Sequence, residues 1–224
     1  MTTKPARRPT ATRPSLHRPS RTRLIASDAE PVADRELDAR LHALFEEGRA
    51  FWHRFDAEVR QDDFHPFVPA DYEAVRSALS SLDTPGRRFL EWGSATGVIT
   101  IMADLLGYDA CGIELDSSLV REARELASRS GSKARFAAGS FIPMGWQWKQ
   151  AGGDGRHGTI GGGRSGYLEL GHALDEFDVV YGYPWMGEEP MMLDLMRAHG
   201  RDDAYFVLHT TQDGTKIYRG GRLV

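Results

Sequence analysis

The feature that most constrains this chain is a regular alternation of short apolar runs and amphipathic segments between residues 86 and 210. The apolar runs predict buried strands at 88–92, 110–115, 134–138, 177–182 and 204–209. The segments between them repeat apolar residues at three- and four-residue spacing, which predicts helices at 98–106, 117–130 and 190–199. Strands and helices that alternate in this way form a mostly parallel sheet with helices on both faces, an α/β three-layer sandwich of the Rossmann-like kind.

Two more helices are predicted before this alternation begins. Apolar residues at helical spacing run through 34–60, and a shorter segment at 71–82 shows the same pattern. An irregular apolar link at 64–69 joins the two segments. We expect this helical extension to cover an edge of the sheet or a pocket.

Composition divides the chain into three parts. Residues 1–24 hold seven basic residues, no acidic residue and four prolines, so we expect 1–30 to be a disordered basic tail. A helical cap at 31–84 and a sheet domain at 85–224 follow. Nine glycines within 145–166 predict a flexible insertion in the sheet domain.

Several classes of protein are excluded by simple counts. Cys111 is the only cysteine among 224 residues, which excludes a disulfide scaffold and a zinc site of several cysteines. No spaced His, Asp and Glu cluster supports a metal site. No apolar run approaches the roughly 20 residues that span a bilayer, and no signal peptide is visible. We therefore expect a cytoplasmic protein without membrane contact, while its oligomeric state stays open.

The net charge of −4 conceals an asymmetry. Residues 25–224 carry 21 basic and 32 acidic residues, a net charge of −11. An acidic body does not favour nucleic acid as a partner. The basic tail leaves such a partner open without favouring it.

Ligands of open α/β sheets bind at the carboxyl ends of the strands, so the residues at those ends are the candidates for a site. The first strand runs into Glu91-Trp92-Gly93-Ser94-Ala95-Thr96-Gly97, and the second ends in Gly112-Ile113-Glu114-Leu115-Asp116. Glu114 follows Gly93 by 21 residues. At this spacing an acid accepts hydrogen bonds from ribose hydroxyls.

The glycine turn argues against a nicotinamide dinucleotide. Ala95 stands where such a turn has its second glycine, and Glu91 would repel a pyrophosphate. An acid at that place suits a ligand with an ammonium group, as in S-adenosylmethionine. Glu91 has a second interpretation, in which it binds a helix N-terminus and has only a structural role.

At these motifs the chain resembles the class I S-adenosylmethionine-dependent methyltransferases, over residues 86–210. The match is carried by Phe89-Leu90-Glu91-Trp92-Gly93-Ser94-Ala95-Thr96-Gly97 followed by Gly112-Ile113-Glu114. The resemblance implies that Glu91 contacts the methionine amino group, Glu114 the ribose and Ser140 the adenine, with Phe141 stacked nearby. The cofactor-binding residues that it implies are Glu91, Gly93, Ser94, Gly97, Glu114, Leu115, Ser140 and Phe141.

The resemblance also implies that the end of the fourth predicted strand faces the methyl acceptor. Tyr181, Tyr183 and Trp185 are the candidate catalytic residues there, and His65 is a candidate general base, as are other histidines. The segment Gly182-Tyr183-Pro184-Trp185 lacks the polar residue that precedes Pro in relatives that methylate bases, so a small-molecule acceptor is favoured.

Only 14 residues follow Thr210, so we expect the C-terminal hairpin of the usual fold to be missing or reduced to one short antiparallel strand at 215–218. The expected function is an S-adenosylmethionine-dependent methyltransferase. A non-catalytic module that binds this cofactor and an NAD-dependent oxidoreductase are the alternatives.

Overall fold

The computed structural model describes residues 32–60, 67–82, 86–148, 163–185 and 187–224. Residues Val32–Val224 form one compact unit. The predictions for the tail at 1–30, for His65 and for the middle of the glycine-rich insertion lie outside the described residues.

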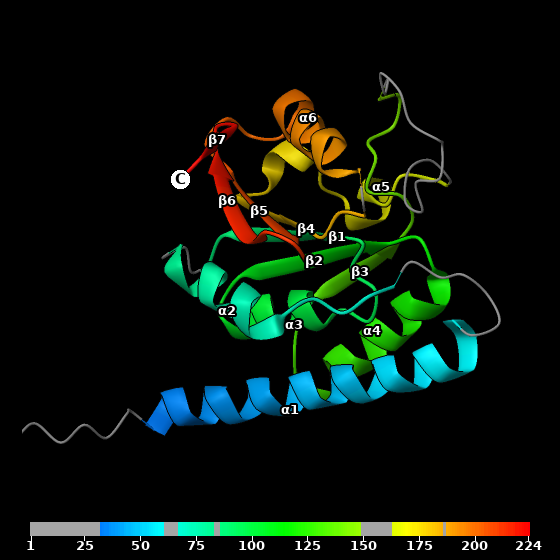
Figure 1. The fold of residues 1–224 in the computed structure, drawn as a ribbon, viewed down its shortest axis with the longest axis vertical. Coiled ribbons are helices and arrows are strands. Elements are labelled where there is room, and N and C mark those ends of the chain that lie inside the picture. The colour runs from blue at the N-terminus through cyan, green and yellow to red at the C-terminus, as the bar shows by residue number, and fades with distance from the viewer. Residues whose placement is uncertain (1–31, 61–66, 83–85, 149–162, 186) are drawn as a thin grey trace, which may run out of the picture. The chain divides into compact units, whose positions relative to one another are not determined.

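A seven-stranded sheet lies at the centre of the described part, in the order β3-β2-β1-β4-β5-β6-β7 (Figure 1). The parallel strands are β1 (Arg88–Trp92), β2 (Asp109–Glu114), β3 (Arg135–Ala138), β4 (Val179–Gly182) and β5 (Tyr205–Thr210). Antiparallel pairing follows for β6 (Gly214–Arg219) and β7 (Arg222–Leu223). The predicted Rossmann-like, mostly parallel sheet is confirmed. Its strand order reverses between β1 and β4, where a ligand crevice is expected.

Helices cover both faces of this sheet (Figure 1). On one face lie α2 (Tyr72–Ser81), α3 (Val98–Leu105) and α4 (Ser117–Arg129), with α1 (Val32–Phe55) packed outside α3 and α4. A π-helical turn, Asp56–Arg60, extends α1. The opposite face carries α5 (Tyr167–Leu170), a 3-10 turn at Leu174–Glu176 and α6 (Glu189–His199). The predicted helices are all present, and α5 and the 3-10 turn were not predicted.

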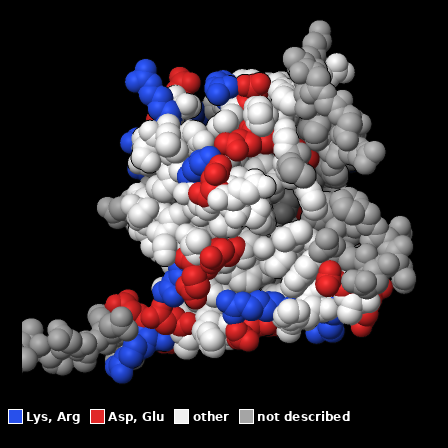
Figure 2. Space-filling model, viewed as in Figure 1, with Lys and Arg blue, Asp and Glu red and all other residues white. Residues whose placement is uncertain are grey.

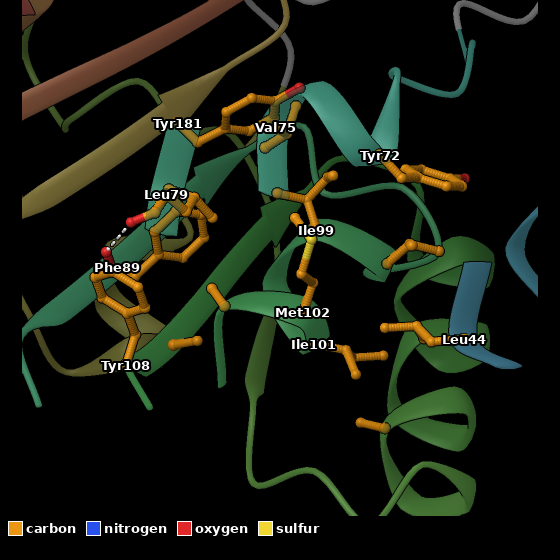
Figure 3. Close-up of a cluster of buried hydrophobic side chains, with 14 of the residues drawn as sticks. Leu44, Tyr72, Val75, Leu79, Phe89, Ile99, Ile101, Met102, Tyr108 and Tyr181 are labelled. Atoms are coloured by element: carbon orange, nitrogen blue, oxygen red, sulfur yellow. Dashed lines mark hydrogen bonds between the residues drawn. The ribbon is translucent and has the colours of Figure 1, made fainter. Parts of the chain in front are cut away.

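The alternation of side chains along the strands separates two apolar clusters, one on each face of the sheet. Phe89 of β1 and Val207 of β5 point toward α2 and α3, while Leu90 and Phe206 point toward α6. Figure 3 shows the first cluster, in which the hydroxyl of Tyr108 donates to the carbonyl of Leu79 at 3.0 Å. These clusters fix the layers on either side of the crevice.

The C-terminal hairpin is reduced, as predicted, but β7 was not expected. Gly220 and Gly221 both have positive φ, at 55° and 73°, and they turn the chain so that two residues pair with β6. This backbone suits a tight hairpin turn.

The crossing of α1 over α3 depends on Gly48. A Cβ atom at this position would lie 2.6 Å from Cγ2 of Val98 and 3.1 Å from the hydroxyl oxygen of Tyr72. Because Val98 is the first residue of α3, this contact sets the distance between α1 and the turn that precedes α3.

We expect Gly48→Ala to destabilise the protein by about 1–3 kcal/mol, because the added methyl group overpacks the crossing. Helix propensity alone predicts the opposite sign, a gain of about 0.5–1 kcal/mol. Urea denaturation of both proteins measures the difference. A gain in the free energy of unfolding would show that α1 does not approach α3 this closely.

Candidate functional site

A pocket of about 360 Å³ opens at the carboxyl ends of the parallel strands, where the sequence predicts a site. Its size is within the range of small-molecule sites. Residues of the predicted site that line it are Gly93, Glu114, Leu115, Phe141, Tyr183 and Trp185.

The floor of the pocket begins with the turn between β1 and α3. The N–H groups of Gly93 and Ser94 both donate to the carbonyl of Ile113, at 2.9 and 3.0 Å, which ties the turn to β2. Positive φ angles occur at Gly93, Ala95 and Gly97. Gly97 also has no room for a side chain, because a Cβ atom would lie 2.6 Å from the ring of Phe136.

Glu114 reaches back from the end of β2 to this turn. One carboxylate oxygen accepts from the N–H of Ala95 at 2.8 Å, and the other accepts from the N–H of Asp116 at 3.0 Å. Burial raises the pKa of Glu114, and these backbone N–H groups oppose the rise. Each oxygen keeps a lone pair that can accept from a hydroxyl group of a ligand.

Glu91 lies behind the turn and does not line the pocket. Its carboxylate accepts from both the N–H and the hydroxyl group of Thr100, in the first turn of α3. This contact with the first turn of α3 is the kind of bond that the second interpretation of Glu91 predicts. Burial is the largest influence on the pKa of Glu91 and raises it to about 8.

Phe141 and Trp92 form one wall of the pocket. Their rings stack at 5.1 Å with 15° between the planes, and the indole N–H of Trp92 donates to the hydroxyl of Tyr167 at 2.9 Å. Ser140 is not among the residues that line the pocket. Its hydroxyl accepts from the N–H of Ile142, and its own N–H donates to the carbonyl of Arg164. The hydroxyl of Ser94 is buried with no partner among the described atoms.

The side of the pocket next to the end of β4 contains two of the four predicted catalytic residues. Tyr183 and Trp185 line it, and the N–H of Trp185 donates to Glu188 at 2.9 Å. The ring of Tyr183 meets that of His209 edge-on at 5.2 Å. Tyr181 is placed elsewhere: it is 1% exposed in the core between the sheet and α2 (Figure 3). Its hydroxyl is buried with no hydrogen-bond partner among the described atoms, and Tyr181 is not among the residues that line this pocket.

Sequence reasoning missed several residues that line the pocket. The end of β5 contributes 210–212, and the same carboxyl-end rule that identified the other residues would have found them. Leu119, at the start of α4, and Met192, in α6, also line the pocket, but the sequence around them does not distinguish them from core residues. Phe67 and Val68 come from the apolar link before α2, which was noted without a role for these two residues.

The described residues that line the pocket include three glutamates, Glu114, Glu188 and Glu189, and neither lysine nor arginine. On the face drawn in Figure 2, basic and acidic side chains are interspersed and do not gather by sign. Within the described ranges, no three His, Cys, Asp or Glu side chains are grouped as metal ligands. No described helix is both long and apolar enough to cross a membrane.

Comparison with known proteins finds methyltransferases. The chain is 34% identical over 85 residues to a ribosomal protein L11 methyltransferase of Thermus thermophilus, covering 35% of this chain and 34% of that protein. It is 31% identical over 91 residues to the Neisseria gonorrhoeae protein of the same name, covering 39% and 31%. The chain thus spans about a third of the length of these relatives.

Solved structures that are similar to this chain include an RNA methyltransferase from Salinibacter ruber in complex with S-adenosyl-L-homocysteine. It is 20% identical, with a TM-score of 0.48, over 64% of this chain and 78% of that one. No protein-family model matches the chain. The predicted resemblance to class I methyltransferases is confirmed by the curated relatives.

Replacement of Glu91 by glutamine tests the burial of its carboxyl group. The folded pKa of about 8 lies above the ordinary value of 4.5, so between these pH values the folded state holds a proton that the unfolded state has lost. Stability of the wild type therefore falls as the pH rises through this window. Glutamine does not ionise and still offers an oxygen to Thr100.

We expect the free energy of unfolding of the wild type to fall relative to Glu91→Gln between pH 5 and 8, by about 1 kcal/mol or more, and to level off above pH 8. Urea denaturation across this range provides the measurement. The exposed Glu125→Gln on α4 is the matched control, and its profile should run parallel to that of the wild type. If the profile of Glu91→Gln also ran parallel to that of the wild type, the raised pKa of Glu91 would be contradicted.

Proposed function

We propose that this chain is an S-adenosylmethionine-dependent methyltransferase. The observation that carries the proposal is the pairing of Glu114 with the Gly93–Gly97 turn inside one pocket at the switch in strand order. The similarity to curated methyltransferases over 85 and 91 residues supports it. Ala95 in place of a glycine remains an argument against a dinucleotide, whereas Glu91 no longer is one, because it is buried behind the turn and does not line the pocket.

The described residues suit the parts of this cofactor. The remaining lone pairs of Glu114 would accept from the two ribose hydroxyls, and Leu115 and Phe141 supply apolar surface for an adenine ring. The glycine turn lets the ligand approach the backbone closely. The bound cofactor supplies a methyl group on a sulfonium, and the protein's part is to align it with the acceptor, an effect worth about 7–11 kcal/mol in favourable cases.

We also propose a small-molecule acceptor, held at Tyr183 and Trp185. The pocket is small, and its described lining has three glutamates without a basic residue. Such a lining is unfavourable for the phosphates of a nucleic acid. The curated relatives are named as ribosomal protein methyltransferases, so a protein acceptor is the alternative that the experiment must include.

Calorimetric titration with S-adenosylhomocysteine tests the cofactor. We expect micromolar binding to the wild type, no binding of NAD, and at least a roughly tenfold weaker affinity for Glu114→Ala, because charge-assisted hydrogen bonds are lost. Asp116→Ala is the matched control, since Asp116 caps α4 two residues further on and does not line the pocket. Equal affinities for wild type and Glu114→Ala would place the ligand elsewhere.

Methyl transfer from labelled S-adenosylmethionine tests the acceptor. We expect label in a small molecule from a cell extract passed through a size filter, and the same rate, within about twofold, when residues 1–24 are deleted, since the basic tail would serve only a polyanion. Ribosomal proteins and RNA are the parallel acceptors. If ribosomal protein or RNA is labelled, and this label is lost when the tail is deleted, the acceptor is a macromolecule and the small-molecule proposal is wrong. Tight cofactor binding with no transfer to any acceptor would favour the non-catalytic module.

A further inference from the structure

The pocket has an aromatic wall that comes from outside the sheet domain predicted from the sequence. Phe67 lies just before α2 and lines the pocket together with Ala95, Glu114 and Leu119. In the structure its side chain is 8% exposed, so its surroundings hold it in place.

Three aromatic side chains at the end of α1 hold this ring. Phe67 meets Trp52 edge-on at 5.4 Å and Phe55 at 5.4 Å, and Phe51 lies 6.4 Å away. Phe51 and Phe55 stack on each other at 6.1 Å. Such edge-on and stacked pairs add attraction beyond the apolar area that they bury. The position of Phe67 is thus fixed by α1.

The same cluster reaches the residues that surround Glu114. Leu119 is buried in it, and Ala95 packs against it. Ala95 is also the residue whose N–H donates to Glu114. The aromatic cluster therefore adjoins the point where a carboxylate would meet the ribose, and it keeps bulk water from one side of that point.

We propose that Phe67 is a cofactor-binding residue, whose ring covers the ribose of a bound adenosine nucleoside beside Glu114. The inference rests on the proposed function, since it takes S-adenosylmethionine as the ligand. An apolar wall beside the carboxylate strengthens hydrogen bonds to the ribose, because water competes less for them. The aromatic ring also removes apolar surface of the nucleoside from water.

This assignment gives α1 a part in binding. Gly48 brings α1 close to Val98 at the start of α3, and the aromatic residues follow within the next two turns. Arg129 of α4 also forms an exposed ion pair with Glu47 of α1. Through these contacts α1 places Phe67 without touching the ligand, so Trp52 and Phe55 are positioning residues.

The test is calorimetric titration of the full chain with S-adenosylhomocysteine, together with thermal melting of each protein with and without this ligand. We expect Phe67→Ala to weaken binding roughly tenfold to a hundredfold, because the ring loses its contact with the ligand. The rise of the melting temperature on adding ligand should shrink accordingly. Should Phe67→Ala fail to fold, Phe67→Leu keeps most of the volume, and a roughly threefold to tenfold loss is expected.

Tyr108→Ala is the matched control. Tyr108 is a buried aromatic residue that lies outside the aromatic cluster and does not line the pocket, so its removal should lower the melting temperature and leave the dissociation constant within about threefold. Equal losses of affinity for Tyr108→Ala and Phe67→Ala would overturn the proposal, because the loss would then follow from stability alone.

The two proposals fail in different ways. Wild-type binding that Phe67→Ala and Phe67→Leu leave unchanged would overturn the role of Phe67 and leave the cofactor assignment standing. Absence of binding to the wild type would overturn the proposed function, and the role of Phe67 with it.

Discussion

The pocket depends on a five-residue turn that is held by two glutamates, the buried Glu91 and the half-buried Glu114. Three residues of Gly93–Gly97 have positive φ, and one of them, Ala95, is not a glycine. A left-handed backbone at such a residue costs about 1–2 kcal/mol, so it persists only where its surroundings determine it. Glu114 accepts the N–H of Ala95 on the pocket side, while Glu91 accepts the N–H of Thr100 on the far side. The turn therefore has its shape before a ligand binds. Of the two glutamates that hold it, Glu114 lines the pocket and Glu91 does not.

The position of α1 follows from the same constraint. The helix that continues from the turn starts at Val98, and Gly48 lets α1 cross at this residue. From there α1 carries its aromatic residues to the cluster that contains Leu119 and adjoins Ala95. A side chain at position 48 would displace the helix and, with it, this cluster. The N-terminal segment and the glycine turn therefore form one packed structure, in which the contact at Gly48 sets the distance between them.

The sequence predicts the central fold closely where local signals are strong. The bounds of β1 agree residue for residue, because an apolar run there ends at a glycine with positive φ. The two-residue β7 was missed, although the pair Gly220-Gly221 is a hairpin signal. Residues at strand ends were identified by the topology of parallel sheets, as Glu114 and Phe141 show. The direction of Tyr181 and the bond of Ser140 to residue 164 depend on packing between distant segments, which no local pattern encodes.

Trp92 ties the wall of the pocket to the neighbouring strands of the sheet. Its ring stacks on Phe141, which lines the pocket, and lies 5.4 Å from Phe206 of β5. The hydrogen bond from its indole to Tyr167 prevents rotation of the ring. Groups set on strands are held more precisely than groups set on loops. For the proposed methyl transfer, which would gain most from alignment, a buried tryptophan that holds this wall of the pocket in place would contribute without supplying a proton or a charge.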